Sequence, residues 1–186
     1  MITMKKNIVL IGMPGVGKST IGVILAKILG YKFLDTDLLI QQNQGKRLKE
    51  LISDEGIDGF IEIENQINSK LTADKSVIAT GGSVIYGKEA MKNLSEIGII
   101  IYLKLDYKKL RYRLGNIQNR GVVIRKNQRL WDLYAERVPL YEKYADIVVD
   151  ETGCGIEKTI NKIVAELADY DSEFCEIAQS SNGEKH

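Results

Sequence analysis

Short apolar runs recur along the chain and predict the buried strands of a sheet. Residues 8–11 are four aliphatic residues in succession, and residues 99–103 are apolar throughout. A strand whose residues are all apolar is typical of a parallel sheet that is covered on both faces. Comparable runs predict five strands, at 8–11, 31–34, 76–79, 98–103 and 146–149.

Between these runs the apolar residues follow the period of an amphipathic helix. In the last such segment Ile156, Ile160, Ile163 and Leu167 fall on one helical face. Strands that alternate with helices predict an α/β fold in three layers, with a parallel five-stranded sheet between two layers of helices. We predict helices at 21–29, 38–44, 48–53, 57–71, 87–94, 107–114, 130–144 and 156–170, with a break or kink at Pro139.

A glycine-rich segment lies between the first predicted strand and the first predicted helix. Gly12, Gly17, Lys18 and Ser19 occupy the fixed positions of the phosphate-binding pattern G-x-x-x-x-G-K-[ST]. Backbone N–H groups of such a loop bind phosphate oxygens, and the positive end of the helix dipole adds to the attraction. Lys18 is expected at the β- and γ-phosphates and the Ser19 hydroxyl at Mg²⁺. A glycine-rich turn without a ligand is the alternative. The predicted nucleotide-binding residues of this loop are Gly12, Gly15, Val16, Gly17, Lys18, Ser19 and Thr20.

Two carboxylates follow the second predicted strand. Asp35 and Asp37 are two residues apart, a spacing that points both side chains the same way in an extended segment. One carboxylate is expected to hold Mg²⁺, and the other to accept the proton of an attacking hydroxyl group. The alternative is that the pair caps the helix that follows, because aspartate is a preferred N-cap residue.

Thr80-Gly81-Gly82-Ser83 ends the third predicted strand. Glycines at this place let a ligand lie against backbone N–H groups, although a plain turn has the same composition. The carboxyl ends of parallel strands share one edge of the sheet, and ligands of α/β proteins bind there. The phosphate loop, the aspartate pair and the glycine pair are therefore predicted to line one crevice.

The segment 104–129 is strongly basic, with nine Lys and Arg residues against one Asp. Residues 115–128 lack apolar periodicity, and we interpret them as a mobile lid that brings Arg120 to the phosphates. A solvated helix face or a nucleic-acid-binding patch would also be basic. Further along, Arg137 is a candidate for bidentate binding of a carboxylate or for an ion pair within its own helix with Asp132.

Composition narrows the function further. The chain has 186 residues, of which 44% are apolar and 27% charged, as in soluble globular domains. Its net charge of +1 gives no general attraction to nucleic acid or membranes. Two cysteines make no disulfide framework, and the single histidine, His186, argues against a histidine-ligated zinc site.

With no signal peptide or long apolar run, a cytoplasmic location is expected. We expect one domain at 1–170 and a disordered polar tail at 171–186.

These motifs, in this order, resemble shikimate kinases, which are small P-loop kinases related to the nucleoside-monophosphate kinases. The resemblance covers about residues 7–165, nearly all of the predicted domain. The matching segments are Gly12 to Thr20, Asp35-Thr36-Asp37, Asp54-Glu55-Gly56 with Phe60 and Glu64, Ala79 to Gly82, Arg113 with Arg120, Arg137 to Tyr141, and Ala145-Asp146.

The resemblance implies a sheet order of 2-3-1-4-5 and an ATP- and Mg²⁺-dependent kinase that works as a monomer, without a nucleic-acid or membrane partner. By this resemblance Lys18 is a catalytic residue at the transferring phosphoryl group, and Ser19 and Asp35 hold Mg²⁺. Arg113 would stack on the adenine. Arg120, in the lid, would lie near the phosphates as a second catalytic residue.

For the acceptor, the resemblance implies shikimate, which is phosphorylated on its 3-hydroxyl group. Asp37 would lie at that hydroxyl as the catalytic base. Gly81 and Gly82 would face the acceptor, and Arg137 would bind its carboxylate.

Three positions depart from the family pattern. Ile61 follows Phe60 where the family has an arginine that binds the substrate carboxylate, whereas Glu64, the usual partner of that arginine, is present. Ser83 takes the place of a third glycine. The lid reads Arg120-Gly121-Val122-Val123 in place of Arg-Pro-Leu-Leu.

The missing arginine leaves the acceptor open. Loss of one charged clamp weakens carboxylate binding by a few kcal/mol, and Arg137, assisted by Arg47, would be the remaining cation. The alternative is a kinase of the same fold that acts on another small hydroxylated metabolite. A nucleotide-dependent regulatory or RNA-binding domain is the non-enzymatic alternative.

Overall fold

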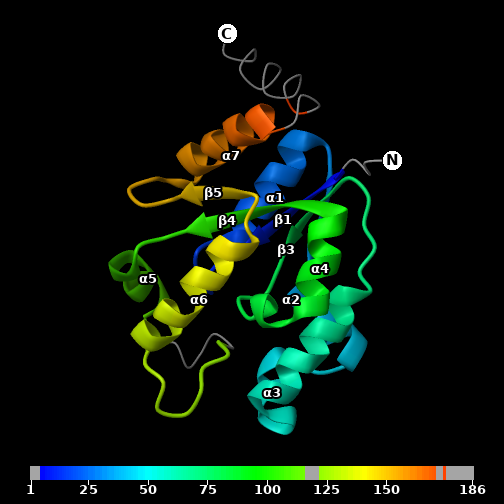
Figure 1. The fold of residues 1–186 in the computed structure, drawn as a ribbon, viewed down its shortest axis with the longest axis vertical. Helices are drawn as coiled ribbons and strands as arrows, with labels where there is room; N and C mark the ends of the chain where they lie inside the picture. The colour runs from blue at the N-terminus through cyan, green and yellow to red at the C-terminus, as the bar shows by residue number, and fades with distance from the viewer. Residues whose placement is uncertain (1–4, 116–121, 171–173, 175–186) are drawn as a thin grey trace.

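The computed structural model describes residues 5–115, 122–170 and 174 of the chain. Its core is a five-stranded parallel sheet with the order β2-β3-β1-β4-β5 (Figure 1). The fold class and the strand order expected from the sequence are therefore confirmed. The strands are β1 (Asn7–Ile11), β2 (Lys32–Asp35), β3 (Ser76–Ala79), β4 (Gly98–Lys104) and β5 (Ile147–Asp150).

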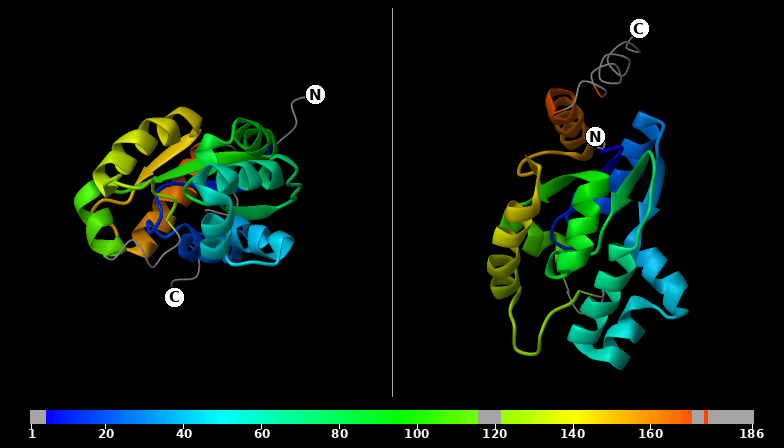
Figure 2. Two further views of the ribbon diagram at one scale, coloured as in Figure 1. Left: turned by 90° about the horizontal axis from the view of Figure 1, so that it is seen from below. Right: turned by 45° about the vertical axis from the view of Figure 1, so that its right-hand side comes forward.

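Helices cover both faces of this sheet. They are α1 (Lys18–Leu29), α2 (Thr36–Gln44), α3 (Leu48–Ser69), α4 (Lys88–Ile97), α5 (Tyr107–Leu114), α6 (Leu130–Tyr144) and α7 (Ile156–Tyr170), with a short 3₁₀ helix, η1 (Val84–Tyr86), after β3. α1 and α7 lie on one face of the sheet, and α4 and α6 lie on the other (Figure 2). α2 and α3 lie together at one end of the molecule (Figure 1). The three predicted layers are present.

β1 is the central strand, and it is hydrogen-bonded on both sides. Val9 pairs with Ile78 of β3 and with Ile100 of β4, and all three side chains are fully buried. Continuous burial explains why the sequence of β1 shows no alternation of polar and apolar residues. The core of the domain is built around this strand.

Two predicted interruptions of helices have different outcomes. Gly56 has a φ of 70° and a ψ of 178°, so the helical conformation is interrupted there within α3. A φ in this region favours glycine, which explains the break predicted between 48–53 and 57–71. α6, in contrast, continues past Pro139 to Tyr144.

Parts of two predicted segments fall outside the described residues. Arg120 and Gly121, in the predicted lid, are not among them, and neither is most of the tail at 171–186. From the tail, Phe174 is described, and its buried ring lies 6.4 Å from that of Tyr31 between centroids. Within the described parts of the chain, no helix has the length and apolar character needed to cross a membrane.

Asn7 connects the start of β1 to two neighbouring segments. Its Nδ2 donates to the carbonyl oxygens of Ala73 at 2.9 Å and Ile97 at 2.8 Å, and its Oδ1 accepts from the Ser76 backbone N–H at 3.0 Å. The side chain is buried. One amide thus binds three backbone groups of neighbouring segments.

We expect Asn7→Ala to lower the free energy of unfolding by roughly 2–4 kcal/mol, because it removes three hydrogen bonds from a buried site. Urea denaturation followed by circular dichroism measures the change. Asn161→Ala, at an exposed position of α7, is the matched control and should change the free energy by less than about 0.5 kcal/mol. A loss in Asn7→Ala no larger than that of the control would show that water replaces the amide.

Candidate active site

Most of the predicted site residues surround one cavity of about 420 Å³ at the carboxyl ends of β1 and β3. Apolar residues also line it, among them Phe60 and Val123. The crevice predicted from the strand ends is therefore present, although Asp35 of the aspartate pair does not line it. The predicted residues that line it are Gly15, Gly17, Lys18, Ser19, Thr20, Asp37, Gly81, Gly82 and Arg137.

The loop after β1 turns through backbone conformations that require glycine. Gly12 has a φ of 148° and Gly17, just before α1, has a φ of 108°. A Cβ on Gly12 would also lie 2.7 Å from the carbonyl oxygen of Leu103. Such a loop directs successive N–H groups toward one point, which is the geometry of a phosphate-binding nest.

The side chain of Lys18 folds back over the phosphate loop. Its Nζ donates to the carbonyl oxygens of Gly12 at 2.8 Å and Met13 at 3.0 Å. Burial lowers its pKa to about 8, and the nearby Asp37 carboxylate opposes that shift. Lys18 therefore remains mostly protonated at neutral pH, as a cation at the mouth of the loop.

Asp35 both caps a helix and faces the phosphate loop. Its Oδ1 accepts from the backbone N–H groups of Asp37 at 3.0 Å and Leu38 at 3.4 Å, at the start of α2. Its Oδ2 accepts from the Ser19 hydroxyl at 2.8 Å. The capping role and the metal-binding role were alternatives in the sequence, and this geometry is compatible with both.

Ser19 and Asp35 together offer two oxygen ligands at the edge of the cavity. Mg²⁺ commonly takes one or two protein oxygens and completes its shell with water and phosphate oxygens. The described residues contain no group of three or more His, Cys, Asp or Glu side chains that could hold a metal. The donor set therefore fits a magnesium ion that arrives with a nucleotide better than a resident metal.

Asp37 lines the cavity beside Lys18. Burial, together with the nearby Asp35 carboxylate, raises the pKa of its carboxyl to about 6 against the opposing effect of Lys18. A carboxylate with a pKa near 6 is ionised at neutral pH and still basic enough to accept a proton from a hydroxyl group.

Arg137 is fully buried on the opposite wall. Its Nη2 donates to the Val123 carbonyl oxygen at 2.8 Å, and its Nε donates to the Tyr86 hydroxyl at 3.3 Å. Asp132, the intrahelical alternative, pairs with Arg129 instead. Nη1 has no hydrogen-bond partner among the described residues. A buried guanidinium with a free N–H group at a cavity is suited to bind an anion.

Glu64 does not line the cavity but supports its wall through Ser83, and the sequence indicated it only as the partner of an absent arginine. Its Oε2 accepts from the Ser83 hydroxyl at 2.5 Å, and its Oε1 has no partner among the described residues. Burial raises the pKa of Glu64 to about 7, and the Ser83 hydrogen bond opposes that shift. Its position four residues after Phe60 was the available signal, since this places a carboxyl on the buried face of α3.

Gly81 shows why the wall requires a glycine. A Cβ at this residue would lie 2.3 Å from Oε1 of Glu64 and 2.8 Å from Oδ1 of Asp37. The two carboxyl groups therefore approach the same point from either side of the strand end. Any larger residue would displace one of them.

Ile61 and Arg47 both lie outside the main cavity. Ile61 lines a side cavity of about 210 Å³, which shares Val123 and Arg137 with the main one. Arg47 is exposed at the start of α3 and does not line the main cavity. Among the described residues, Arg137 is therefore the one arginine that lines the main cavity.

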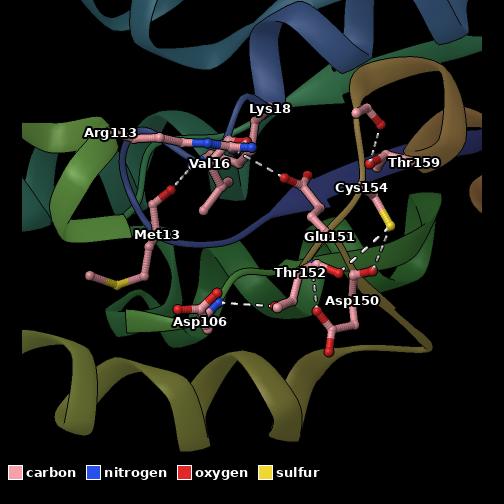
Figure 3. Close-up of polar contacts among 11 residues, drawn as sticks. Met13, Val16, Lys18, Asp106, Arg113, Asp150, Glu151, Thr152, Cys154 and Thr159 are labelled. Atoms are coloured by element: carbon pink, nitrogen blue, oxygen red, sulfur yellow. Dashed lines mark hydrogen bonds and ion pairs between the residues drawn. The ribbon is translucent and has the colours of Figure 1, made fainter. Parts of the chain in front are cut away.

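A further cavity of about 280 Å³ lies next to the phosphate loop and contains the predicted residues Val16 and Arg113. Arg113 Nη1 donates to the Val16 carbonyl oxygen at 2.8 Å and to Glu151 Oε2 at 3.3 Å (Figure 3). Glu151 is buried, and burial raises the pKa of its carboxyl, opposed by Arg113. Sequence reasoning missed Glu151 and the neighbouring Cys154, because the turn after β5 carries no motif.

Comparisons with known proteins agree with this geometry. The sequence model of the family described as "Shikimate kinase" matches residues 14–168. A shikimate kinase of Thermodesulfovibrio yellowstonii is 38% identical over 164 residues, which cover 87% of this chain and 94% of the relative. A solved structure, the shikimate kinase from Acinetobacter baumannii in complex with shikimate, has a TM-score of 0.82 at 30% identity and covers 90% of this chain and 96% of that one. A thymidylate kinase from Candida albicans shares the fold, with a TM-score of 0.55 at 15% identity and coverage of 91% and 93%.

The raised pKa of Glu64 predicts a pH-dependent effect on stability. The folded chain holds this proton up to about pH 7, whereas the ordinary pKa of the carboxyl is 4.5. Stability is therefore lost as the pH rises from 4.5 to 7, and Glu64→Gln avoids that loss. We expect Glu64→Gln to match the wild type below about pH 4.5 and to exceed it by about 3 kcal/mol at about pH 8.

Urea unfolding at a series of pH values measures this difference. Glu62→Gln, at an exposed position of the same helix, controls for the substitution itself. A difference between Glu64→Gln and the wild type that is independent of pH would show that Glu64 is ionised throughout.

Proposed function

The chain belongs to the shikimate kinase family, and from this premise we propose that it transfers the γ-phosphoryl group of ATP to the 3-hydroxyl group of shikimate. Members of this family are ATP-dependent phosphotransferases. The single observation that best supports shikimate as the acceptor is Arg137, which lines the cavity shared with the phosphate loop and whose Nη1 has no hydrogen-bond partner among the described residues. Shikimate carries one carboxylate, which such a group would bind.

In this proposal the phosphate loop and Lys18 bind the triphosphate. The N–H groups of the loop and the Lys18 ammonium neutralise charge on the transferring phosphoryl group, which is where most of the rate acceleration of such kinases arises. Arg113 would lie against the adenine in the cavity beside Val16. Arg120, outside the described residues, would be a second cation near the phosphates.

Ser19 and Asp35 would hold Mg²⁺, which supplies charge neutralisation at the β- and γ-phosphate oxygens when bound. Asp37 would accept the proton of the attacking hydroxyl group. Gly81 and Gly82 would let the acceptor lie close to the backbone. The proposed site uses residues of one chain, so we propose that the enzyme works as a monomer.

A second acceptor class is favoured by one observation. Ile61 lines the side cavity, so its side chain offers no charge to an acceptor carboxylate. A hydroxylated metabolite with less negative charge than shikimate, or with an apolar group directed toward Val123, would fit such a wall. Measuring ADP release with each acceptor distinguishes the two.

The function is tested by ADP release in a coupled assay with Mg-ATP, with and without shikimate. We expect a shikimate-dependent rate of roughly 1–100 per second. Lys18→Ala is the matched inactive control, because it removes a charge from the transferring phosphoryl group. A rate at millimolar shikimate no higher than that of Lys18→Ala would contradict shikimate as the acceptor, and a screen of other hydroxylated metabolites would follow.

The proposed base predicts the pH profile. The pKa of Asp37 is about 6, so kcat/KM should fall about tenfold for each pH unit below that value as the carboxylate gains its proton. Asp37→Asn should lower kcat by roughly 10²–10⁴-fold and leave the affinity for ATP largely intact. If Asp37→Asn kept full activity, the base would have to be another group.

A further inference from the structure

A buried carboxyl group and a buried guanidinium flank the glycine pair without contacting each other. Oε1 of Glu64 lies 2.3 Å from the point that a Cβ of Gly81 would occupy, and Nη1 of Arg137 lies 3.1 Å from the corresponding point of Gly82. Glu64 is 1% exposed and Arg137 is fully buried, and each of these two atoms lacks a hydrogen-bond partner in the part of the chain that is described. A buried carboxylate usually pairs with a nearby cation, so the absence of an ion pair between these two described residues needs a cause.

Ser83 provides that restraint on the carboxyl side. Its hydroxyl donates to Oε2 of Glu64 at 2.5 Å, in a buried contact between the end of β3 and α3. On the other side, the Val123 carbonyl oxygen and the Tyr86 hydroxyl hold the guanidinium of Arg137. Each charge is thus fixed by a neutral partner and not by the opposite charge.

We propose that Ser83 is a positioning residue of the acceptor site, because it holds the Glu64 carboxyl away from Arg137 and leaves Nη1 of Arg137 free for the acceptor's carboxylate. The proposal rests on the function proposed above, in which Arg137 binds that carboxylate. If Glu64 paired with Arg137, the pair would carry no net charge and Nη1 would be occupied. The anion site would then be closed by the protein's own carboxylate.

Ile61 makes the serine necessary. An isoleucine on this side of α3 gives Glu64 no cation from its own helix, so Arg137 is the nearest guanidinium that could compensate its charge. The other charged groups that act on Glu64 are Asp37 from α2 and Lys18 from α1. Asp37 repels the carboxylate, and Lys18 is held by the carbonyl oxygens of its own loop. Arg137 is therefore the partner that Glu64 would take if Ser83 released it.

The affinity for shikimate, measured by calorimetry without ATP, tests this role. We expect Ser83→Ala to weaken binding about tenfold, and Ser83→Thr, which keeps the hydroxyl, to stay within about twofold of the wild type. Combined with Glu64→Gln, Ser83→Ala should add less than about twofold, because a neutral amide forms no ion pair with Arg137. Ser95→Ala, whose hydroxyl bonds within α4, is the matched control. An equal loss in the wild-type and Glu64→Gln backgrounds, or no loss at all, would overturn the proposal.

A second measurement does not depend on the acceptor. The pH-dependent stability difference between Ser83→Ala and Ser83→Ala/Glu64→Gln reports how Glu64 ionises once the serine is removed. Pairing with Arg137 would favour the carboxylate, so the difference should become smaller than that between the wild type and Glu64→Gln. If Ser83→Ala only removed a hydrogen-bond donor from Glu64, this pH-dependent stability difference would become larger, and that result would overturn the proposal. If the wild type bound no shikimate, only the proposed acceptor would be contradicted. The stability measurement would still decide whether Ser83 holds Glu64 and Arg137 apart.

Discussion

The pairing of β1 on both edges is the constraint on which the active site depends. Register places Leu10 beside Ala79, and Ala79 beside Asp35, so three strands end side by side. Thr80 strengthens this alignment, because its backbone N–H and its hydroxyl both donate to the Leu10 carbonyl oxygen. The phosphate loop, the glycine pair and the aspartate pair each follow one of these ends. Their mutual distances are therefore set by sheet geometry and not by contacts between the functional side chains.

Three ionisable groups line the cavity and a fourth, Glu64, lies behind its wall, and burial weakens the charge of three of the four. Lys18, Asp37 and Glu64 all have pKa values displaced toward neutrality, and in each case desolvation is the largest cause. Arg137 alone stays charged under all ordinary conditions. Triphosphate oxygens at the loop would reverse the displacement for Lys18, since a nearby negative charge stabilises the ammonium. The ionisation of the site is therefore set jointly by the protein and its ligands.

The sequence was sufficient for the features that depend on local pattern. The positions of the five strands, though not their order, follow from five apolar runs. The phosphate loop follows from glycine positions whose φ values no other residue adopts easily. The contact between Ser83 and Glu64 could not be predicted in this way, because it joins residues 19 apart on different elements. Ile61 and Ser83 were visible only as separate departures from a pattern. Their relation depends on the tertiary approach of α3 to the end of β3.

The hydrogen bond between Ser83 and Glu64 also limits the order in which two positions can change during evolution. In an ancestor with arginine at 61 and glycine at 83, loss of the arginine first would leave Glu64 to pair with Arg137, and this pair would close the anion site. An enzyme with that intermediate sequence would bind its acceptor poorly. Serine arriving first would find a carboxylate already in place to accept its hydroxyl. We therefore expect that serine at position 83 preceded the loss of arginine at position 61. Relatives with arginine at 61 and serine at 83 would represent the intermediate sequence.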